Sequence, residues 1–250
     1  MADRYESRHT GPRLTFEFFP VTALSNDVLH HPALWRGNDC ARVAIPSVPT
    51  GFAELDILLP GRGWPREALT EIYAERPGVG ELQLLMPALA RLTQDERWLA
   101  MIAPPYIPYA PALLDHGIRL SHMMLIRPET VELQLWAGEQ ALRSGSCGAV
   151  LLWLNHVPER ALRRLQLAAE GSGALVMLFR LARTAPFTSA ALRFHVSKTK
   201  GRTSVRILKR RGGGIPAPVM LDLHRVSTRH LAALFKPVLP ETGAFQAAHY

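Results

Sequence analysis

The residues best placed to do chemistry in this chain follow a short apolar segment. Leu69 to Tyr73 reads as a buried strand, and residues 74–80 form a turn rich in proline and glycine. Apolar side chains then recur at the spacing of a helix, at Leu82, Leu85, Leu89 and Leu92. A strand, a glycine loop and a helix in this order frame a phosphate-binding loop, whose pattern is G-x-x-x-x-G-K-[ST]. The sequence therefore predicts the backbone of such a loop here.

The side chains that give this loop its chemistry are missing. On the pattern, Gly80 takes the second glycine and Glu75 the first, while Gly78 lies between them. Glu81 stands where the pattern has lysine, and Leu82 stands where it has the hydroxyl residue. The lysine normally binds the β- and γ-phosphates, and the hydroxyl ligates Mg²⁺. The loop is thus predicted to be a vestige of a nucleotide site.

The negative charge of Glu81 determines whether this loop can bind a nucleotide. Two unit charges about 4 Å apart interact by roughly 4 kcal/mol at an effective dielectric near 20. Exchanging the lysine for Glu81 turns that attraction into repulsion, so we expect no productive ATP binding and no cofactor. An ordinary strand, turn and helix with no phosphate-binding history remains the alternative.

Composition narrows the class of protein. The chain has 250 residues, 48% of them hydrophobic, and a formal net charge of +8, which favours nucleic acid or an acidic protein as partner. Cys40 and Cys147 fit no metal-binding spacing, and His30 and His31 have no acidic or cysteine companion, so no metal is predicted. The absence of a long apolar run and of a secretion signal predicts a cytoplasmic protein without a membrane span.

The elements that must position the loop alternate between strand and helix. This order predicts an α/β fold, a mostly parallel twisted sheet flanked by helices, with a late antiparallel edge. Further strands are expected at 98–103, 123–126, 149–154, 174–179, 192–196, 204–208 and 219–223. Helices are expected at 53–59, 112–116, 129–144 and 158–169. The predicted domains are an N-terminal arm over 1–42, a core over 43–224 and a tail over 225–250.

The order of motifs resembles the RecA recombinase family. The likeness lies in Pro-Thr-Gly-Phe-Ala-Glu-Leu-Asp at 49–56, in the segment that ends Leu-Thr-Glu-Ile-Tyr at 63–73, and in segments 138–145 and 203–218. The resemblance implies a RecA-like core. It places the family's catalytic glutamate at Pro104 and its Walker B aspartate at Asn155. Neither residue can replace the carboxylate, so a pseudo-ATPase is predicted rather than an enzyme.

Among RecA-like proteins without ATPase activity, the chain is most similar to the ImuA family. Segments 31–37, 59–66 and 69–72 carry this likeness. It implies a role in SOS-induced, error-prone translesion DNA synthesis, with ImuB and an error-prone polymerase as partners and RecA as a further candidate. Two alternatives stay open: a SulA-like inhibitor of cell division that binds FtsZ, and an active RecA-type DNA-dependent ATPase.

Two further segments are candidate contact sites. A basic run on the late hairpin is predicted to bind DNA or an acidic partner. Lys and Arg side chains bind the phosphates of DNA whatever the base sequence. Its members are Lys198, Lys200, Arg202, Arg206, Lys209, Arg210 and Arg211. The alternative is a solvated edge hairpin. Leu29, Leu34 and Trp35 are predicted to form an interaction arm for self-association, since tryptophan is enriched at binding hot spots. The alternative is packing on their own core.

Overall fold

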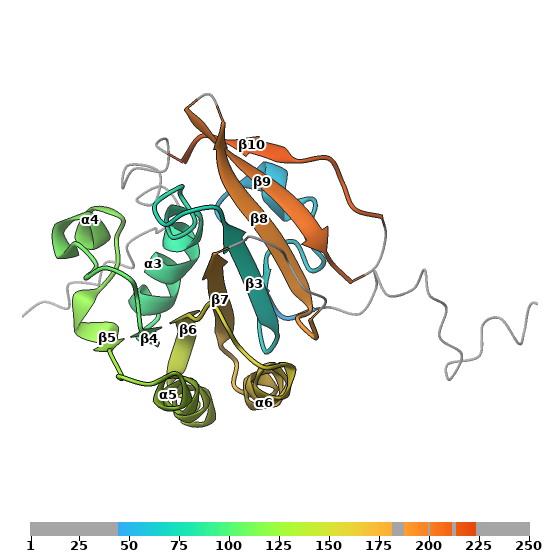
Figure 1. Ribbon diagram of the computed structural model, residues 1–250. Coiled ribbons are helices and arrows are strands. Elements are labelled where there is room, and N and C mark those ends of the chain that lie inside the picture. The colour runs from blue at the N-terminus through green and yellow to red at the C-terminus, as the bar shows by residue number, and fades with distance from the viewer. Residues whose placement is uncertain (1–44, 182–187, 200, 212–213, 224–250) are drawn as a thin grey trace, which may run out of the picture. The chain divides into compact units, whose positions relative to one another are not determined.

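The structure is a computed structural model that describes residues 45–181, 188–199, 201–211 and 214–223 (Figure 1). All of these belong to the unit Asn38–Tyr250. The predicted arm, with Leu29, Leu34 and Trp35, therefore lies outside the described residues. So do the tail over 225–250 and Lys200 of the basic run.

An eight-stranded sheet is the centre of the fold, with the order β10-β9-β8-β3-β7-β6-β4-β5. The predicted α/β class, with a mostly parallel sheet flanked by helices, is confirmed. The strands are β3 Leu69–Ala74, β4 Trp98–Ile102, β5 Met123–Ile126, β6 Cys147–Trp153, β7 Leu175–Leu181, β8 Leu192–Thr199, β9 Arg202–Lys209 and β10 Val219–Leu221.

The late edge differs in one detail from the expectation. Strand β8 pairs parallel with β3, and only from β9 onward are the pairs antiparallel. After β7 the chain thus adds one more parallel strand, β8, and the antiparallel β9 follows it. This arrangement places β8 directly beside the strand that leads into the phosphate loop.

The helices alternate with these strands along the chain. They are α2 Ala53–Asp56, η3 Gln83–Leu85, α3 Met86–Gln94, α4 Ala110–Asp115, η4 Leu120–His122, α5 Val131–Arg143 and α6 Glu159–Ala169. The start of α5 is set by its capping residue, because the Thr130 hydroxyl accepts a hydrogen bond from the Leu133 N–H. A small sheet of β1 Ser47–Val48 and β2 Trp64–Pro65 was not foreseen, because two-residue strands carry no alternation to read.

Both faces of the central strands are buried, each in its own core. In β6, Ala149 and Leu151 belong to the cluster that includes α3, whereas Val150 and Leu152 belong to the cluster that includes α5 and α6. Figure 1 shows these helices on opposite faces of the sheet. This two-sided burial explains why the strands read as unbroken apolar runs. The candidate site lies at the carboxyl ends of these buried strands.

Candidate functional site

The phosphate loop runs from the end of β3 to η3 and is closed by its neighbours. Gly80 has φ +108°, and a Cβ there would lie 2.7 Å from Leu223 Cδ1 and 2.9 Å from Thr203 Oγ1. Only glycine therefore fits in both conformation and space. The Thr203 hydroxyl also donates to the Val79 carbonyl at 3.4 Å. Strand β9 and the residues after β10 thus pack directly onto the loop.

Glu81 folds back onto the loop that precedes it. Its Oε1 accepts a hydrogen bond from the Gly78 N–H at 2.8 Å, and the residue is 8% exposed. Its Oε2 is buried and has no hydrogen-bond partner among the described residues. A backbone N–H of the kind that cradles phosphate is thus bound to a carboxylate of the chain itself.

The other loop positions give no ligand to a metal. Leu82 packs against the larger core and supplies no oxygen side chain. Glu75 is exposed. Among the described residues, no three His, Cys, Asp or Glu side chains gather where they could hold a metal ion. His30 and His31 lie outside that part of the chain.

A cavity of about 180 Å³ lies at the carboxyl ends of β3, β4, β6 and β7, and we call it the loop cavity. Its walls include Glu81, Pro105, Trp153, Asn155, Phe179 and Arg180. The structure thus brings together two predicted positions, Glu81 and Asn155. Pro104 is buried beside the cavity wall, at the end of β4.

Asn155 has a structural task at the Walker B position. Its side-chain Oδ1 accepts from the Leu181 N–H at 3.0 Å. Its main-chain carbonyl accepts from Arg180 Nε at 3.3 Å and from Arg180 Nη2 at 3.0 Å. These bonds tie the end of β6 to the end of β7. The side-chain oxygen of Asn155 is thus engaged within the fold.

A buried network of charged and polar groups lies behind the loop cavity, and we call it the Glu71 cluster. Glu71 is fully buried and forms ion pairs with Arg180 and Arg193, both at 3.1 Å. The carboxylate also accepts from the Tyr73 hydroxyl at 2.9 Å and from the Thr188 hydroxyl at 2.8 Å. Four donors thus satisfy one carboxylate, which is the condition for a stable buried charge.

The Glu71 cluster also perturbs Tyr73. Burial raises the pKa of Tyr73 above its ordinary value of 10.0, while the hydrogen bond from Arg193 acts in the opposite direction. Sequence reasoning did not single out this cluster. A signal was present, because Arg180 and Arg193 each stand directly between two apolar residues of the sequence, and Glu71 lies within the predicted buried strand. Fully buried charges are rare unless they are paired.

The described members of the basic run fall into two groups by their contacts. Arg202 donates to the Met220 carbonyl, Lys209 to that of Thr188, and Arg210 to those of Leu58 and Gly214. These three side chains therefore support the fold. The remaining described members are exposed and make no side-chain hydrogen bond or ion pair within the described residues, namely Lys198, Arg206 and Arg211.

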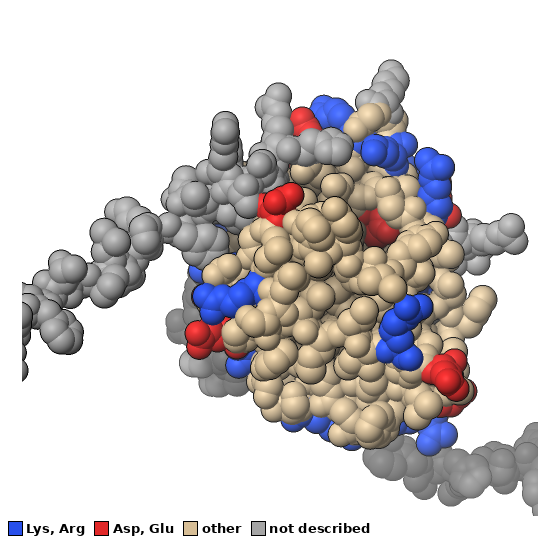
Figure 2. All heavy atoms as spheres, turned by 90° about the vertical axis from the view of Figure 1, so that its left-hand side faces the viewer, with Lys and Arg blue, Asp and Glu red and all other residues tan. Residues whose placement is uncertain are grey.

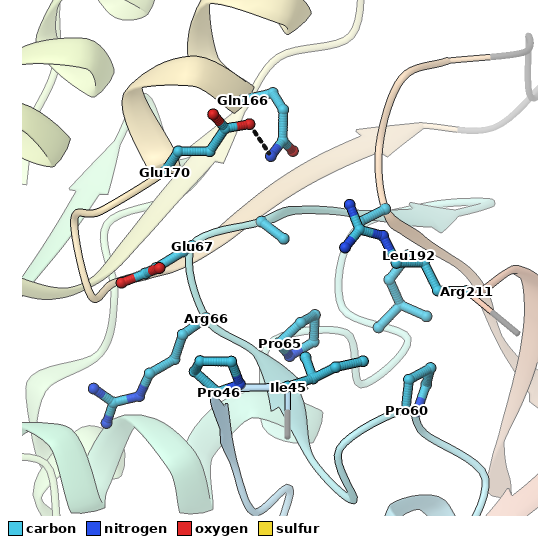
Figure 3. Close-up of a pocket in the computed structure, with 12 residues that line it drawn as sticks. Ile45, Pro46, Pro60, Pro65, Arg66, Glu67, Gln166, Glu170, Leu192 and Arg211 are labelled. Atoms are coloured by element: carbon cyan, nitrogen blue, oxygen red, sulfur yellow. Dashed lines mark hydrogen bonds between the residues drawn. The ribbon is translucent and has the colours of Figure 1, made fainter. Parts of the chain in front are cut away.

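Arg211 belongs to a second and larger cavity of about 350 Å³ (Figure 3). This cavity lies beside the starts of β3 and β8, away from the phosphate loop at the other end of β3. Arg66 and Glu67 bond the backbone of Gly173 there, and Gln166 accepts from the Leu69 N–H. Because it lies at the start of β3 and not at its end, this cavity is separate from the phosphate loop.

The opposite edge of the sheet is poor in charge. Strand β5 ends the sheet, and exposed apolar side chains lie on it and on the elements around it, including Tyr109, Leu114, Leu125 and Trp136. We call these four residues the β5 edge surface. Figure 2 shows this side of the molecule as mostly uncharged side chains, with single charged groups among them and more at the rim. Large apolar side chains exposed in this way make the β5 edge surface a candidate contact site.

Comparisons with known proteins find sequence similarity over part of the chain. The family model for the cell division inhibitor SulA matches residues 68–176, which run from before β3 into β7. The RecA protein of Acholeplasma laidlawii is 30% identical over 123 residues, covering 48% of this chain and 36% of that relative. The RecA protein of Synechococcus elongatus is 24% identical over 120 residues, covering 48% and 33%.

The chain is also similar to a cell division inhibitor SulA of Yersinia pestis, at 31% identity over 99 residues, covering 40% of this chain and 58% of that relative. The chain spans about a third of the length of the RecA proteins it matches. No helix among the described residues has the length and apolarity needed to cross a bilayer. The similarity to RecA thus covers about half of the chain, and the similarity to the SulA family model covers residues 68–176.

Proposed function

We propose that this protein is a non-catalytic, RecA-like accessory protein of the ImuA kind. It acts in SOS-induced, error-prone translesion DNA synthesis as an adaptor for ImuB and an error-prone polymerase, and it modulates RecA. The partial likeness to RecA supports the SOS context. The observation that carries the non-catalytic role is Glu81, whose carboxylate accepts the Gly78 N–H in the phosphate loop.

The two residues at the positions of the RecA family's catalytic glutamate and Walker B aspartate also support this proposal. Asn155 uses its side-chain oxygen to accept from the Leu181 N–H, and Pro104 has no group that could activate water. ATP hydrolysis in phosphate-loop enzymes needs a positive charge and a metal ion on the phosphates. A chain without these groups works by contact rather than by turnover.

The two edges of the sheet offer the contacts that an adaptor needs. The β5 edge surface is apolar and suits a protein partner. On the other side of the sheet, Lys198 on β8, Arg206 on β9 and Arg211 after β9 are exposed cations that suit DNA or an acidic partner. An adaptor that binds two partners at once needs two separate surfaces of this kind.

A SulA-like inhibitor of cell division that binds FtsZ is the second candidate function. The match of the SulA family model to residues 68–176 favours it. That match ends within β7, so β8, β9 and β10 lie beyond it. The basic hairpin is formed by β8 and β9, and most of β9 falls in segment 203–218, which resembles RecA.

Affinity purification from DNA-damaged cells distinguishes the two candidates. The tagged full chain is recovered with and without nuclease treatment, and bound proteins are identified by mass spectrometry. Recovery of ImuB that survives nuclease supports the adaptor. Recovery of FtsZ without ImuB replaces it by the inhibitor. Loss of every partner after nuclease contradicts direct protein contact.

Surface variants refine the same experiment. Leu125→Lys and Trp136→Glu place charges on the β5 edge surface, whose members are 39% and 56% exposed at these positions. The matched control is Leu167→Lys, because Leu167 on α6 is apolar and 66% exposed but lies outside that surface. Partner recovery falls in the first two variants and stays unchanged in the control. Equal recovery from all three removes the β5 edge surface from the proposal.

A further inference from the structure

The loop cavity lies where open α/β sheets bind their ligands, outside the carboxyl ends of the strands. Its volume of about 180 Å³ is small for a nucleotide. An apolar cavity of about 150 Å³ is known to hold benzene. The loop cavity therefore has room for one ring or a small fused ring system.

The walls of the loop cavity favour a flat apolar group. Trp153 and Phe179 stack with their ring centroids 4.6 Å apart and their planes at 10°. Both side chains line the cavity, together with Ile72 and Pro105. A further aromatic ring can extend such a pair by offset stacking or by an edge contact.

The polar groups of the cavity are almost all occupied by the fold. Arg180 donates to Glu71 and to the Asn155 carbonyl, and Asn155 Oδ1 accepts from Leu181. Glu81 is the exception, because its Oε2 has no partner while the residue is only 8% exposed. Burying a carboxylate oxygen without a hydrogen bond is costly, so a donor brought by a ligand would be stabilising.

We propose that the loop cavity binds an aromatic ring that carries one N–H or O–H donor, an indole or a phenol. The ring packs on Trp153 and Phe179, and the donor bonds Glu81 Oε2. Because this oxygen is enclosed, binding requires the carboxylate to turn toward the ring, which would alter its hydrogen bond with the Gly78 N–H. The inference rests on the proposed function only in requiring that no nucleotide fill the cavity.

The test titrates the full-length, ¹⁵N-labelled protein with indole and with indene, which has the same shape but no N–H. The Gly78 amide and the Trp153 ring N–H are followed by NMR. We expect saturable indole binding that shifts both signals, with indene binding about tenfold more weakly for the lost hydrogen bond. No saturable indole binding, or equal binding of the two rings, overturns the proposal.

Variants locate the binding. Glu81→Leu should remove the difference between indole and indene, and Trp153→Ala should weaken both. Trp136→Ala is the matched control, since Trp136 is exposed on α5 outside the cavity. If Glu81→Leu fails to fold, Glu81→Ser shortens the side chain so that it no longer reaches the ring, with the same expected loss of preference. Unchanged indole binding in Trp153→Ala contradicts the site.

The same samples show whether the ring belongs to a side chain of a partner protein or to a small molecule. Competition by a short tryptophan-containing peptide assigns the site to a partner's side chain, whereas binding of free indole without peptide competition assigns it to a small molecule. A parallel titration with MgATP reports on the proposed function alone. ATP binding without indole binding overturns both ideas, and absence of both ligands overturns only the inference made here.

Discussion

Glu71 and Glu81 lie on the two sides of one loop, and both are buried, yet their surroundings differ. Glu71 is bound by two arginines, a tyrosine and a threonine. Glu81 has one hydrogen bond to its Oε1 and none to its Oε2. A buried charge whose partners are complete makes its surroundings rigid, whereas a buried polar group without a partner is costly and calls for an explanation such as a ligand. The Glu71 cluster is thus structural, and the loop cavity is the candidate site.

The largest effect is expected from Glu71→Leu. Removing the carboxylate leaves the guanidinium groups of Arg180 and Arg193 buried without their counter-charge. Breaking a buried pair in this way costs about 3–5 kcal/mol. Urea denaturation measures the free energy of unfolding, with the exposed Glu75→Gln as control. A loss below about 1 kcal/mol would show that the cluster is not structural.

Gly80→Ala comes next, because it tests how tightly the loop is closed. The new methyl group would meet Leu223 and Thr203, and the positive φ adds strain. We expect a loss of more than about 1 kcal/mol in the free energy of unfolding. Gly78→Ala is the control, since its φ is also positive but no atom lies within 4 Å of the added carbon. Equal losses in both variants would contradict the close packing of β9 on the loop.

Alkaline pH gives a third and smaller effect. Since the pKa of Tyr73 is raised in the folded state, the unfolded chain loses this proton first once the pH passes 10.0. The stability from the neutral phenol is therefore complete below that pH and falls as the pH rises further. Tyr73→Phe should be less stable at neutral pH but should lose less stability between pH 9 and 11.

The control for this prediction is Tyr109→Phe, because Tyr109 is exposed. Cys147, whose pKa burial also raises, contributes equally to all three proteins and cancels in the comparison. Parallel stability curves for the wild type and Tyr73→Phe above pH 10 would show that Tyr73 titrates as it does in water.

The smallest effect is expected from Glu81→Gln. The amide keeps an oxygen that can accept the Gly78 N–H, and Oε2 has no hydrogen bond to lose. The free energy of unfolding should change by no more than about 1 kcal/mol. A loss as large as that of Glu71→Leu would remove the difference between the two glutamates.

The fold could be predicted from the sequence where one physical signal was strong. Buried strands such as β6 read as apolar runs, and the amphipathic pattern of α6 placed it within a residue. The partners of side chains were beyond reach. Spacing showed that Glu81 replaces a lysine, but not that its carboxylate bonds Gly78 or that Asn155 is held by Leu181. Those contacts depend on how distant strands align, which no local pattern encodes.

The basic run shows the same limit. Its charges are adjacent along the chain, yet Arg202, Lys209 and Arg210 turn to backbone carbonyls of the fold. The pairing of Glu71 with Arg180 and Arg193 joins three strands and could be suspected only from charges inside apolar runs. Sequence thus located the elements, and tertiary contacts assigned the roles.

The most direct test of the account is calorimetric titration of the purified chain with MgATP, followed by an assay for released phosphate. Because Glu81 lies in the phosphate loop where a lysine would be needed, we expect no saturable heat of binding and no phosphate release. Saturable binding at micromolar ATP, with steady release of phosphate from the same sample, would contradict the central claim.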